Sequence, residues 1–490
     1  RVNPQGLVET VELLGSEEIV NGDFANGSTD FDLFGVAALD GNVIDFIDGG
    51  SNTYSGIRQD ITSVAGKQYK IEITVTNWVK GNIQAVFSSN SSSFNVTGNG
   101  VYTAYLSPAS TGNDIEISRD FATGANFSYS VTNVSVKEST KNNLARVDYD
   151  GTASSLLVEP ERTNLVLRSQ EIDNASWSKS SGGIGITPVV TADNVVSPDG
   201  VQNAEKVVFD LNGGGSGDES VYSLLLQNYT SVSGTTYSLS CYLKGENGGE
   251  QIIFDFDSQN SNVVTLTNEW VRYTFSKTVS TNGSRAIRFG SRGNNSGGTY
   301  GSDNPTVYIW GASLEVGSYP TSYIPTSGST VTRVQDQYSK TGISNLINSE
   351  EGVLFVEMAS FGTGSATQYI SITNGVSSSY GLRILYHTNG SVYFQKYVNG
   401  TRTTNLATSS ITITDFNKLA IRYNSTTVDV WANGVEILTN ADTNVIPSGT
   451  LNRLGLDIAD ELNPFFGKVK QLQVFKTSLS DTQLATLTTI

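Results

Sequence analysis

The chain has 490 residues, of which 47 are Asp or Glu and 30 are Lys or Arg, so its formal net charge is −17. This charge repels phosphate backbones and argues against sequence-independent binding of nucleic acid. A single cysteine, Cys241, and a single histidine, His387, exclude an internal disulfide framework and a His-rich metal cluster. No apolar run approaches the roughly 20 residues of a membrane-spanning helix, so we expect no membrane partner.

The composition predicts the fold class. Charged residues make up only 16% of the chain, whereas aromatic residues make up 10% and 49 residues are glycine. Disorder would require few aromatic and β-branched residues, and both are abundant here. We therefore predict an all-β protein of short strands and Gly/Asn/Asp turns. Because the chain opens with Arg1, we also expect its original start to be missing, although processing would give the same picture.

Alternating patterns mark the first clear strands. Apolar residues occupy every second position from Tyr69 to Val75, with polar residues between them. Such alternation places one face of a strand in a core and the other in water. The same pattern runs from Tyr237 to Leu243, and it places Cys241 on the apolar face as a buried hydrophobe rather than a nucleophile.

An internal repeat organises the first two thirds of the chain. The segment TSVAGKQY at 62–69 matches TSVSGTTY at 230–237 in five of eight positions, and each opens an alternating strand. Each is followed by a later β run with an acidic end, VTNVSVKE at 131–138 and VYIWGASLE at 307–315. Two copies of one sandwich module explain this better than a chance match in a Ser/Thr/Gly-rich chain.

Hairpin and helix signals are clearest toward the C-terminus. The pairs Asn389-Gly390, Asn399-Gly400 and Asn433-Gly434 each lie between strand-like runs and predict type I′ turns. Ser480 and Gln483 have the spacing of a capping box before an apolar LATL, which predicts one short C-terminal helix.

These signals predict three β-sandwich modules of the jelly-roll type in tandem. The predicted parts are an N-terminal connecting segment at 1–16, an inserted carbohydrate-binding-like jelly roll at 17–139, a connecting segment at 140–176, a second such jelly roll at 177–325, a linker or strap at 326–351, and a third sandwich at 352–490.

The connecting segments resemble those of bacteriophage tail and fibre proteins. RVNPQGLVETV at 1–11, ARVDYDG at 145–151 and LLVEPERTNLVLRSQEIDNASW at 156–177 are similar to the stretch that introduces carbohydrate-binding-like domains in such proteins, and WGASLEVGSYPTSYIPTSGSTVTRVQD at 310–336 to how that domain closes. In that family the RVN and RVDY pieces lie close together in sequence. The resemblance therefore implies that the first module is inserted between two parts that meet in space.

The modules themselves resemble known sandwich families. IVNGDFANG at 19–27 resembles the first strand of carbohydrate-binding jelly rolls, and the family often holds a structural calcium ion. This chain has Phe31 or Phe34 where the family often has tryptophan, and Thr132-Asn133 where it often has an acidic residue, so metal ligands are left unknown. The stretches at 416–438 and 465–487 resemble laminin-G-like, concanavalin-type domains.

Enzyme signatures are weak in this chain. A concanavalin-type glucanase carries an ExDxxE triplet on one strand, and Asp457, Asp460 and Glu461 come nearest to it at the end of a strand. Asp255 and Asp257 share one side of a strand, as either a calcium- or sugar-binding pair or an exposed face. No GxSxG elbow accompanies His387. We therefore expect no enzymatic activity.

Recognition of a ligand at the protein surface is the remaining class of function. Aromatic side chains on otherwise polar faces are suited to stack against sugar rings. We also consider Arg288 as a candidate glycan contact of the second module, together with Arg272. The alternative is that these outward side chains pack against a neighbouring module or subunit. The candidate glycan contacts are Trp78 and Lys70 in the first module, Tyr242, Lys244 and Arg272 in the second, and Tyr393, Gln395, Tyr397 and Trp431 in the third.

We therefore expect a non-enzymatic virion protein, a tail-fibre, receptor-binding or capsid-decorating component, on the surface of the extracellular particle. Its expected partners are host-surface polysaccharide or glycan, other virion proteins and further copies of the chain in a homo-oligomer. No cofactor is expected beyond a structural calcium ion, which jelly rolls can bind through backbone oxygens. The rival interpretations are a purely architectural virion protein, a secreted bacterial glycan-binding protein and a polysaccharide-degrading enzyme.

Overall fold

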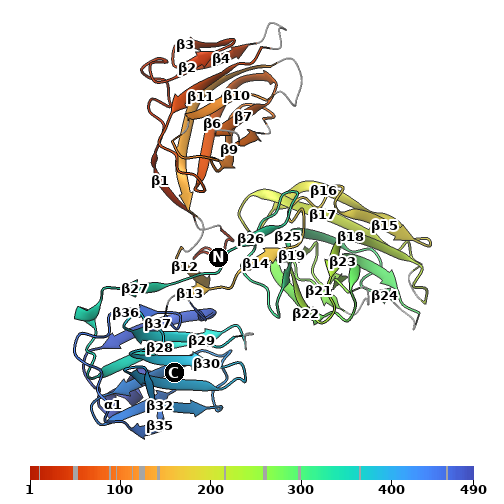
Figure 1. The fold of residues 1–490 in the computed structure, drawn as a ribbon. Coiled ribbons are helices and arrows are strands. Elements are labelled where there is room, and N and C mark those ends of the chain that lie inside the picture. Colours follow the sequence, from red (N-terminus) through yellow and green to blue (C-terminus); the bar gives the residue numbers. More distant parts are fainter. Residues whose placement is uncertain are drawn as a thin grey trace. The chain divides into compact units, whose positions relative to one another are not determined.

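The protein is almost entirely β in the computed structural model, as the composition predicts (Figure 1). The structure describes residues 1–9, 12–47, 53–87, 90–94, 96–112, 114–120, 127–140, 144–214, 217–257, 262–295, 299–362, 366–459 and 462–490. Two compact units divide the chain. One unit is formed by Val11–Leu144, and the other by Arg1–Thr10 together with Ala145–Ile490.

The first unit is a sandwich of two antiparallel sheets. The predicted boundaries at 17 and 139 fall inside it, because a strand at Leu13–Glu17 pairs with the long strand Ser128–Thr140. One sheet has the order β3-β4-β11-β6-β9 with β1 beside β11, formed by β1 (Leu13–Glu17), β3 (Ala37–Asp40), β4 (Val43–Ile47), β6 (Gln68–Lys80), β9 (Gly100–Leu106) and β11 (Ser128–Thr140). The other has the order β2-β5-β10-β7-β8, formed by β2 (Asp32–Phe34), β5 (Gly56–Asp60), β7 (Ile83–Phe87), β8 (Asn90–Phe94) and β10 (Asp114–Arg119).

The second sandwich lies in the larger unit. One sheet has the order β16-β17-β25-β19-β22, formed by β16 (Ile186–Val196), β17 (Gln202–Asp210), β19 (Thr236–Gly245), β22 (Val271–Thr278) and β25 (Thr306–Val316). The other has the order β15-β18-β23-β20-β21 with β24 beside β23, formed by β15 (Ser178–Gly182), β18 (Tyr222–Ser231), β20 (Gln251–Asp255), β21 (Val263–Thr265), β23 (Gly283–Gly293) and β24 (Thr299–Tyr300). Cys241 is buried in the core between these sheets, as predicted.

The two sandwiches repeat one strand topology, which confirms the internal repeat. In each, a long central strand (β6 or β19) lies between the last long strand (β11 or β25) and an edge strand (β9 or β22). The repeated peptide has the same local structure in both copies. The hydroxyl of Tyr69 accepts a hydrogen bond from the backbone N–H of Val64 at 3.0 Å, and that of Tyr237 accepts one from Val232 at 3.1 Å. The matched sequence therefore encodes a tyrosine that anchors the loop before the central strand.

The third sandwich includes strands from outside the predicted module. Its seven-stranded sheet begins with a hairpin of the connecting segment, which pairs with the last strand of the module. That sheet has the order β12-β13-β37-β28-β33-β34-β35, formed by β12 (Arg146–Asp150), β13 (Ala153–Val158), β28 (Gly352–Ser360), β33 (Asn417–Tyr423), β34 (Thr427–Ala432), β35 (Val435–Ala441) and β37 (Gly467–Phe475). The facing sheet has the order β27-β36-β29-β30-β31-β32, formed by β27 (Ser339–Thr341), β29 (Gln368–Thr373), β30 (Gly381–Tyr386), β31 (Val392–Val398), β32 (Thr401–Thr408) and β36 (Arg453–Gly455).

The predicted strap at 326–351 is hydrogen-bonded along its length rather than free. Its strand β26 (Val331–Arg333) pairs with β14 (Arg162–Asn164), and β27 extends the six-stranded sheet. A short 3-10 helix follows at Ser344–Leu346. The two parts of the connecting segment also meet, since the backbone N–H of Val2 donates to Asp148 Oδ1 at 2.8 Å.

Local signals near the C-terminus are largely confirmed. Asn399 and Asn433 have φ near +50° and each precedes a glycine with positive φ, as a type I′ hairpin requires. The Asn389-Gly390 turn is not of type I′, because Gly390 has a positive φ whereas Asn389 does not. The backbone N–H of Gly390 donates to the carbonyl of His387. Ser480 and Gln483 form the predicted capping box of α1 (Asp481–Thr488). Within the described ranges, no helix is long and apolar enough to cross a membrane.

Replacing either repeat tyrosine tests the shared loop anchor. We expect Tyr69→Phe and Tyr237→Phe each to lower local stability by about 0.5–1.5 kcal/mol, because each removes one intramolecular hydrogen bond and leaves the ring in place. Hydrogen exchange of peptides that contain Val64 or Val232 measures this loss. Tyr308→Phe is the control, since the Tyr308 ring packs near Lys206 without a hydroxyl hydrogen bond in the described chain. Unchanged exchange at Val64 and Val232 would contradict the anchoring role.

Candidate functional site

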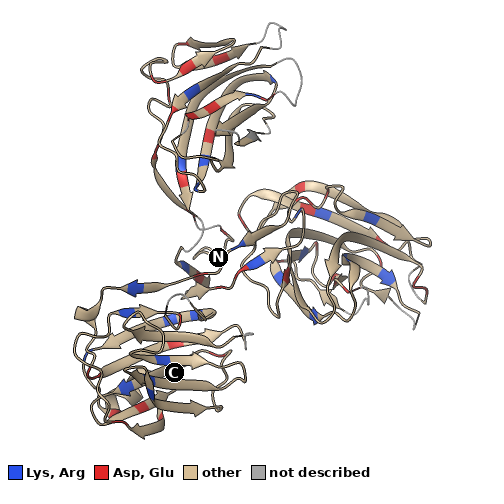
Figure 2. Ribbon diagram, in the orientation of Figure 1, with Lys and Arg blue, Asp and Glu red and all other residues tan. Residues whose placement is uncertain are grey.

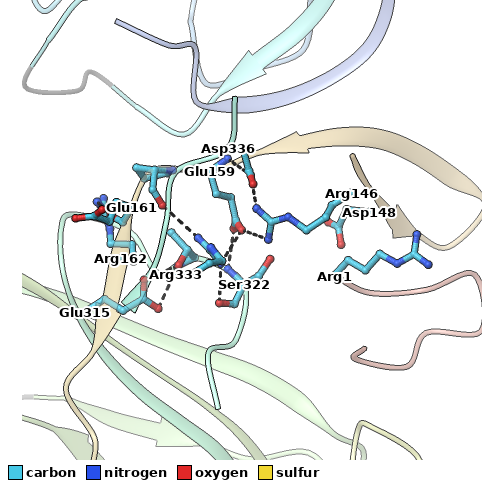
Figure 3. A network of polar contacts seen from close by, with 12 residues as sticks. Arg1, Arg146, Asp148, Glu159, Glu161, Arg162, Glu315, Ser322, Arg333 and Asp336 are labelled. Carbon is cyan, nitrogen blue, oxygen red and sulfur yellow. Dashed lines mark hydrogen bonds and ion pairs between the residues drawn. The ribbon is translucent and has the colours of Figure 1, made fainter. Parts of the chain in front are cut away.

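A buried network of opposite charges holds the connecting segment (Figure 3). Arg146 of β12 pairs with Glu159 at 2.7 Å and also with Asp336 of the strap. Arg333 of β26 pairs with the same Glu159 oxygen at 2.9 Å, and the backbone N–H of Ser322 donates to its other oxygen at 2.7 Å. The network therefore joins β12, the strap and the segment around Ser322 through one carboxylate.

The electrostatics of this network are those of a structural cluster. Burial by itself raises the pKa of Glu159, but Arg333 and Arg146 outweigh burial and hold that pKa below its ordinary value. Two guanidinium groups thus neutralise the carboxylates of Glu159 and Asp336. A glycosidase needs one carboxylic acid that is protonated and a second that is free to act. This cluster supplies neither.

An open cleft of about 350 Å³ lies beside the network in the larger unit. Glu159 and Ser322 of the network contribute to its lining. The remaining lining residues are Arg1, Val2, Val8, Asp148, Leu157, Tyr242, Arg272, Pro320, Thr321, Tyr323, Phe361 and Lys468. Two predicted contact residues, Tyr242 and Arg272, are therefore brought together at one concave site.

Tyr242 and Arg272 are placed by neighbouring strands. They face each other across the β19–β22 pair, and the guanidinium carbon of Arg272 lies 5.6 Å from the centre of the Tyr242 ring. Trp310 of β25 packs edge-on against the same ring at 5.5 Å between centroids. Lys244 follows on β19 opposite Tyr308 and does not belong to the cleft lining.

The other polar residues considered for the second sandwich are buried. Asp255 and Asp257 are 0% and 5% exposed, so the expectation of an exposed face is wrong. Asp255 pairs with Arg288 at 3.5 Å, and Asp257 with Lys277 at 2.9 Å. Arg288 is itself buried, and so it is not open to a ligand.

In the first sandwich, Trp78 does not continue the polar face of β6. Inward and outward side chains alternate along β6 up to Thr76, but Asn77 has a φ of +50° and the pairing with β11 shifts between Thr76 and Lys80. A bulge of this kind re-aims the following side chains. Trp78 is half-buried against the core, and its indole N–H donates to the Gly81 carbonyl at 3.0 Å. Lys70 remains on the outward face and pairs with Glu72 at 3.1 Å.

Tyr393, Gln395 and Tyr397 share the outward face of β31, as their alternation predicts. The opposite face of this strand carries Val392 and Phe394 into the core. Gln395 is 7% exposed and donates to Asn405 Oδ1 on the neighbouring strand at 3.0 Å. The two tyrosines are half-buried, so their rings form part of the surface of the six-stranded sheet.

Two further residues of this face were missed by the sequence analysis. Arg383 of β30 is the direct neighbour of Gln395, and its guanidinium lies 4.2 Å from the centre of the Tyr397 ring. Tyr369 of β29 lies one row away, beside Leu385. Alternation within GLRIL and QYISI marks both outward positions, but it does not reveal that Arg383 is only 1% exposed.

The prediction that Trp431 is open to a ligand is wrong. Trp431 is 7% exposed and packs with Phe355 and with Leu484 of α1. The C-terminal helix therefore covers this part of the seven-stranded sheet. Because alternation along β34 identifies only the side of the sheet, it could not show that a helix far along the chain lies on that side.

Of the three acidic residues that come nearest to a glucanase triplet, the structure describes Asp457, which is paired with an arginine. Asp457 forms a bidentate pair with Arg453, with both distances at 2.6 Å. Asp460 and Glu461 lie outside the described residues. His387 is at the start of a turn, where its Nδ1 accepts a hydrogen bond from the Asn389 N–H at 3.3 Å.

Charged residues of both signs are distributed over the described strands of the sheets (Figure 2). One buried acid is unusual among them. Glu205 of β17 is 2% exposed, and its Oε2 has no hydrogen-bond partner within the described ranges. Burial, together with the charges of Asp173 and Asp193, raises the pKa of Glu205 to about 8. Glu205 is therefore largely protonated in the folded protein at neutral pH.

Removing one arginine tests the buried network. We expect Arg146→Met to lower the free energy of unfolding by about 3–5 kcal/mol, because it leaves buried carboxylates with too few counter-charges. Urea unfolding measures the change. The control is Arg402→Met, which alters an exposed arginine of β32 and should change stability by less than about 0.5 kcal/mol. Equal effects of the two substitutions would contradict the role assigned to the network.

The raised pKa of Glu205 predicts a pH dependence. Its folded-state pKa of about 8 exceeds the unfolded value of about 4.3. The stabilisation that protonated Glu205 contributes is therefore fully present below the unfolded pKa and is lost as the pH rises through the folded pKa. We expect Glu205→Gln to flatten this decline between pH 5 and pH 8, because the amide does not titrate. Urea midpoints at both pH values measure it. Glu269→Gln, at an exposed site, should leave the decline unchanged.

Comparisons with known proteins identify a family model and several solved structures that are similar to parts of the chain. Residues 354–485 match the family model described as the concanavalin A-like lectin/glucanases superfamily. Among solved structures, the CBM40 domain of the Ruminococcus gnavus IT-sialidase bound to alpha2,3 sialyllactose is similar at 18% identity, over 28% of this chain and 83% of that one, with a TM-score of 0.24. Domain 4 of the arabinanase AbnA from Geobacillus stearothermophilus, in complex with arabinotriose, is similar at 13% identity over 33% and 77%, with a TM-score of 0.27.

A mouse laminin alpha1 fragment, domains LG4-5, is also similar, at 10% identity over 56% of this chain and 91% of that one, with a TM-score of 0.20. No curated protein sequence matches the chain. The family match covers most of the third sandwich, without β12, β13 and β27. Residues 354–485 are therefore similar to a laminin-G/concanavalin A-like domain.

Proposed function

We propose that this protein binds glycans without transforming them, through the outward face of the six-stranded sheet in its laminin-G/concanavalin A-like domain. The observation that supports this most directly is the grouping of Tyr369, Tyr393 and Tyr397 around Gln395 and Arg383 on that face. Aromatic rings offer an apolar surface to the C–H faces of a sugar, and the tyrosine hydroxyls bond the hydroxyls of the sugar, while the buried Gln395 and Arg383 hold the rings in place.

The face is also rigid enough to bind without large rearrangement. Its side chains stand on paired strands, and Gln395 is held by Asn405. Arg383 packs against the ring of Tyr397 and supports it from below. A site whose side chains are already ordered loses little conformational entropy when a ligand binds.

Binding rather than hydrolysis fits the described acidic residues. Glu159, Asp255, Asp257 and Asp457 each lie beside a cation within 4 Å. An ionised carboxylate held by a cation is a poor proton donor for a glycosidic oxygen. Repetition of sandwich modules further favours a binding role, because several weak sites on one particle raise the effective concentration of the ligand.

The sequence resemblance of the connecting segments supports a more specific proposal. The chain would be a tail-fibre, receptor-binding or decorating component on a virion surface, present as a homo-oligomer beside other virion proteins, with host polysaccharide as its partner and calcium as a structural ion. Proteomic analysis of purified particles tests this assignment. Detection only in bacterial culture supernatant, without particles, would favour the secreted glycan-binding alternative.

Substitution of the surface tyrosines tests the proposed binding face. We expect Tyr393→Ala and Tyr397→Ala each to weaken binding about tenfold, because each removes one stacking platform worth about 1–2 kcal/mol. A glycan array that includes sialyllactose and arabinotriose, with the full chain, selects the ligand, and calorimetry gives the Kd. Tyr300→Ala, at a half-buried tyrosine of the second sandwich, is the matched control and should bind normally.

Two outcomes would contradict the proposal. One is binding that survives both tyrosine substitutions. The other is the release of new reducing ends from the bound glycan, in an amount that falls when one specific carboxylate is replaced. The first would move the site elsewhere, and the second would make the protein an enzyme.

A further inference from the structure

We propose that the cleft around Tyr242 and Arg272 is a second binding site, for a sugar that carries a carboxylate group. This site is separate from the Tyr393 face. It shares with the proposed function only the assumption that the ligand is a glycan. Its volume of about 350 Å³ lies at the lower end of the range for ligand pockets, about 300–1,000 Å³, which suits one or two sugar rings rather than a long chain.

The charges that line the cleft point to an anionic ligand. Asp148 pairs with Lys468 at 2.9 Å, and Arg1 pairs with Glu9. Glu159 is neutralised by the arginines of the buried network. Arg272 is the lining charge that has no counter-charge among the described residues, so the cleft as a whole offers one uncompensated positive charge.

The hydrogen bonds of Arg272 orient its guanidinium group but do not use all of its N–H donors. Its Nη2 donates to Ser240 Oγ at 2.9 Å and to the Thr321 carbonyl at 2.6 Å. Its Nε is buried and has no partner within the described chain. The guanidinium is thus held in place at the cleft wall by Nη2, and its Nη1 remains to donate to a ligand. A carboxylate oxygen accepts a strong, charge-assisted hydrogen bond from such a nitrogen.

The aromatic residues of the cleft supply the surface for a sugar ring. Tyr242, Tyr323 and Phe361 line it, and Trp310 packs behind Tyr242 and Tyr323 at 5.5 Å and 4.8 Å between ring centres. The hydroxyl of Tyr323 is already hydrogen-bonded to Ser169. Burial raises the pKa of Tyr242, so that its hydroxyl stays protonated and can donate to a ligand oxygen.

The overall charge of the protein does not prevent such binding. The net charge of −17 is spread over 490 residues. At 0.15 M salt, interactions between exposed charges fall off over about 8 Å. The contacts within the cleft are shorter than this distance, and therefore the local charge of Arg272 decides the preference.

Calorimetry at 0.15 M salt with the full chain tests the proposal. The probes are digalacturonate, its neutral counterpart galactobiose, and a sulfated galactose disaccharide. We expect digalacturonate to bind at least tenfold more tightly than galactobiose. We expect Arg272→Gln to abolish this preference and Arg272→Lys to restore part of it. Arg402→Gln, an exposed arginine outside the cleft, is the matched control and should leave binding unchanged.

Replacement of Arg272 could also disturb the local fold, because Arg272 donates to the Thr321 carbonyl. A second variant therefore tests the cleft without removing that hydrogen bond. Tyr242→Phe leaves every hydrogen bond of Arg272 in place and should weaken digalacturonate binding severalfold. Ligand binding should also change the fluorescence of Trp310, which contacts Tyr242.

Equal binding of the acidic and neutral disaccharides, or binding that neither Arg272→Gln nor Tyr242→Phe alters, would overturn the proposal. Binding of the sulfated probe alone would overturn the choice of a carboxylate. The Tyr393→Ala variant separates this site from the proposed function, since it should bind digalacturonate normally. If Tyr393→Ala abolished digalacturonate binding, the ligand would belong to the other face and the cleft proposal would fail.

Discussion

The larger unit depends on one buried carboxylate. Glu159 pairs with Arg146 and Arg333 and accepts a hydrogen bond from the backbone of Ser322, so two regions distant in sequence, 146–159 and 322–333, share a single anchor. Burying these charges is costly, and the network is stable only because each carboxylate keeps its cation. Such networks favour one arrangement over many, since a shifted segment would leave a charge unpaired. The wall of the Tyr242 cleft at Thr321–Tyr323 follows directly from this arrangement.

The same constraint applies to several other buried acids. Asp457 is matched with Arg453 and Asp255 with Arg288, whereas Glu205 is buried with no hydrogen-bond partner for its Oε2 within the described residues. Arg272 and Arg383 each keep a buried guanidinium nitrogen that has no hydrogen-bond partner among the described residues. Arg272 and Arg383 both lie beside a tyrosine on an outward sheet face. Under the two proposals, the tyrosine rings stack against a sugar and Arg272 bonds its carboxylate group.

The repeat shows how little sequence is needed to preserve a sandwich. Five identical residues around Tyr69 and Tyr237 accompany the same strand order in both copies. The tyrosine bonds the loop backbone before the central strand, and the rest of the core follows from alternation with interchangeable apolar residues. Cores tolerate such exchange when volume and pattern are kept. The residues proposed as ligand contacts do not stabilise the core and are therefore free to differ between the copies.

The sequence by itself determined the all-β class, the repeat, two type I′ hairpins, the capped C-terminal helix and the outward placement of Tyr393 and Tyr397. These features depend on period-two alternation and on turn and cap residues, which act over a few positions. Tertiary structure decided what covers each face. It placed α1 over Trp431, re-aimed Trp78 after the bulge at Asn77, and paired Asp255 with Arg288. It also assembled the Tyr242 cleft from segments near residues 1, 148, 320 and 468. Alternation reports the side of a strand on which a residue lies, whereas burial and partners depend on contacts between residues far apart in the chain.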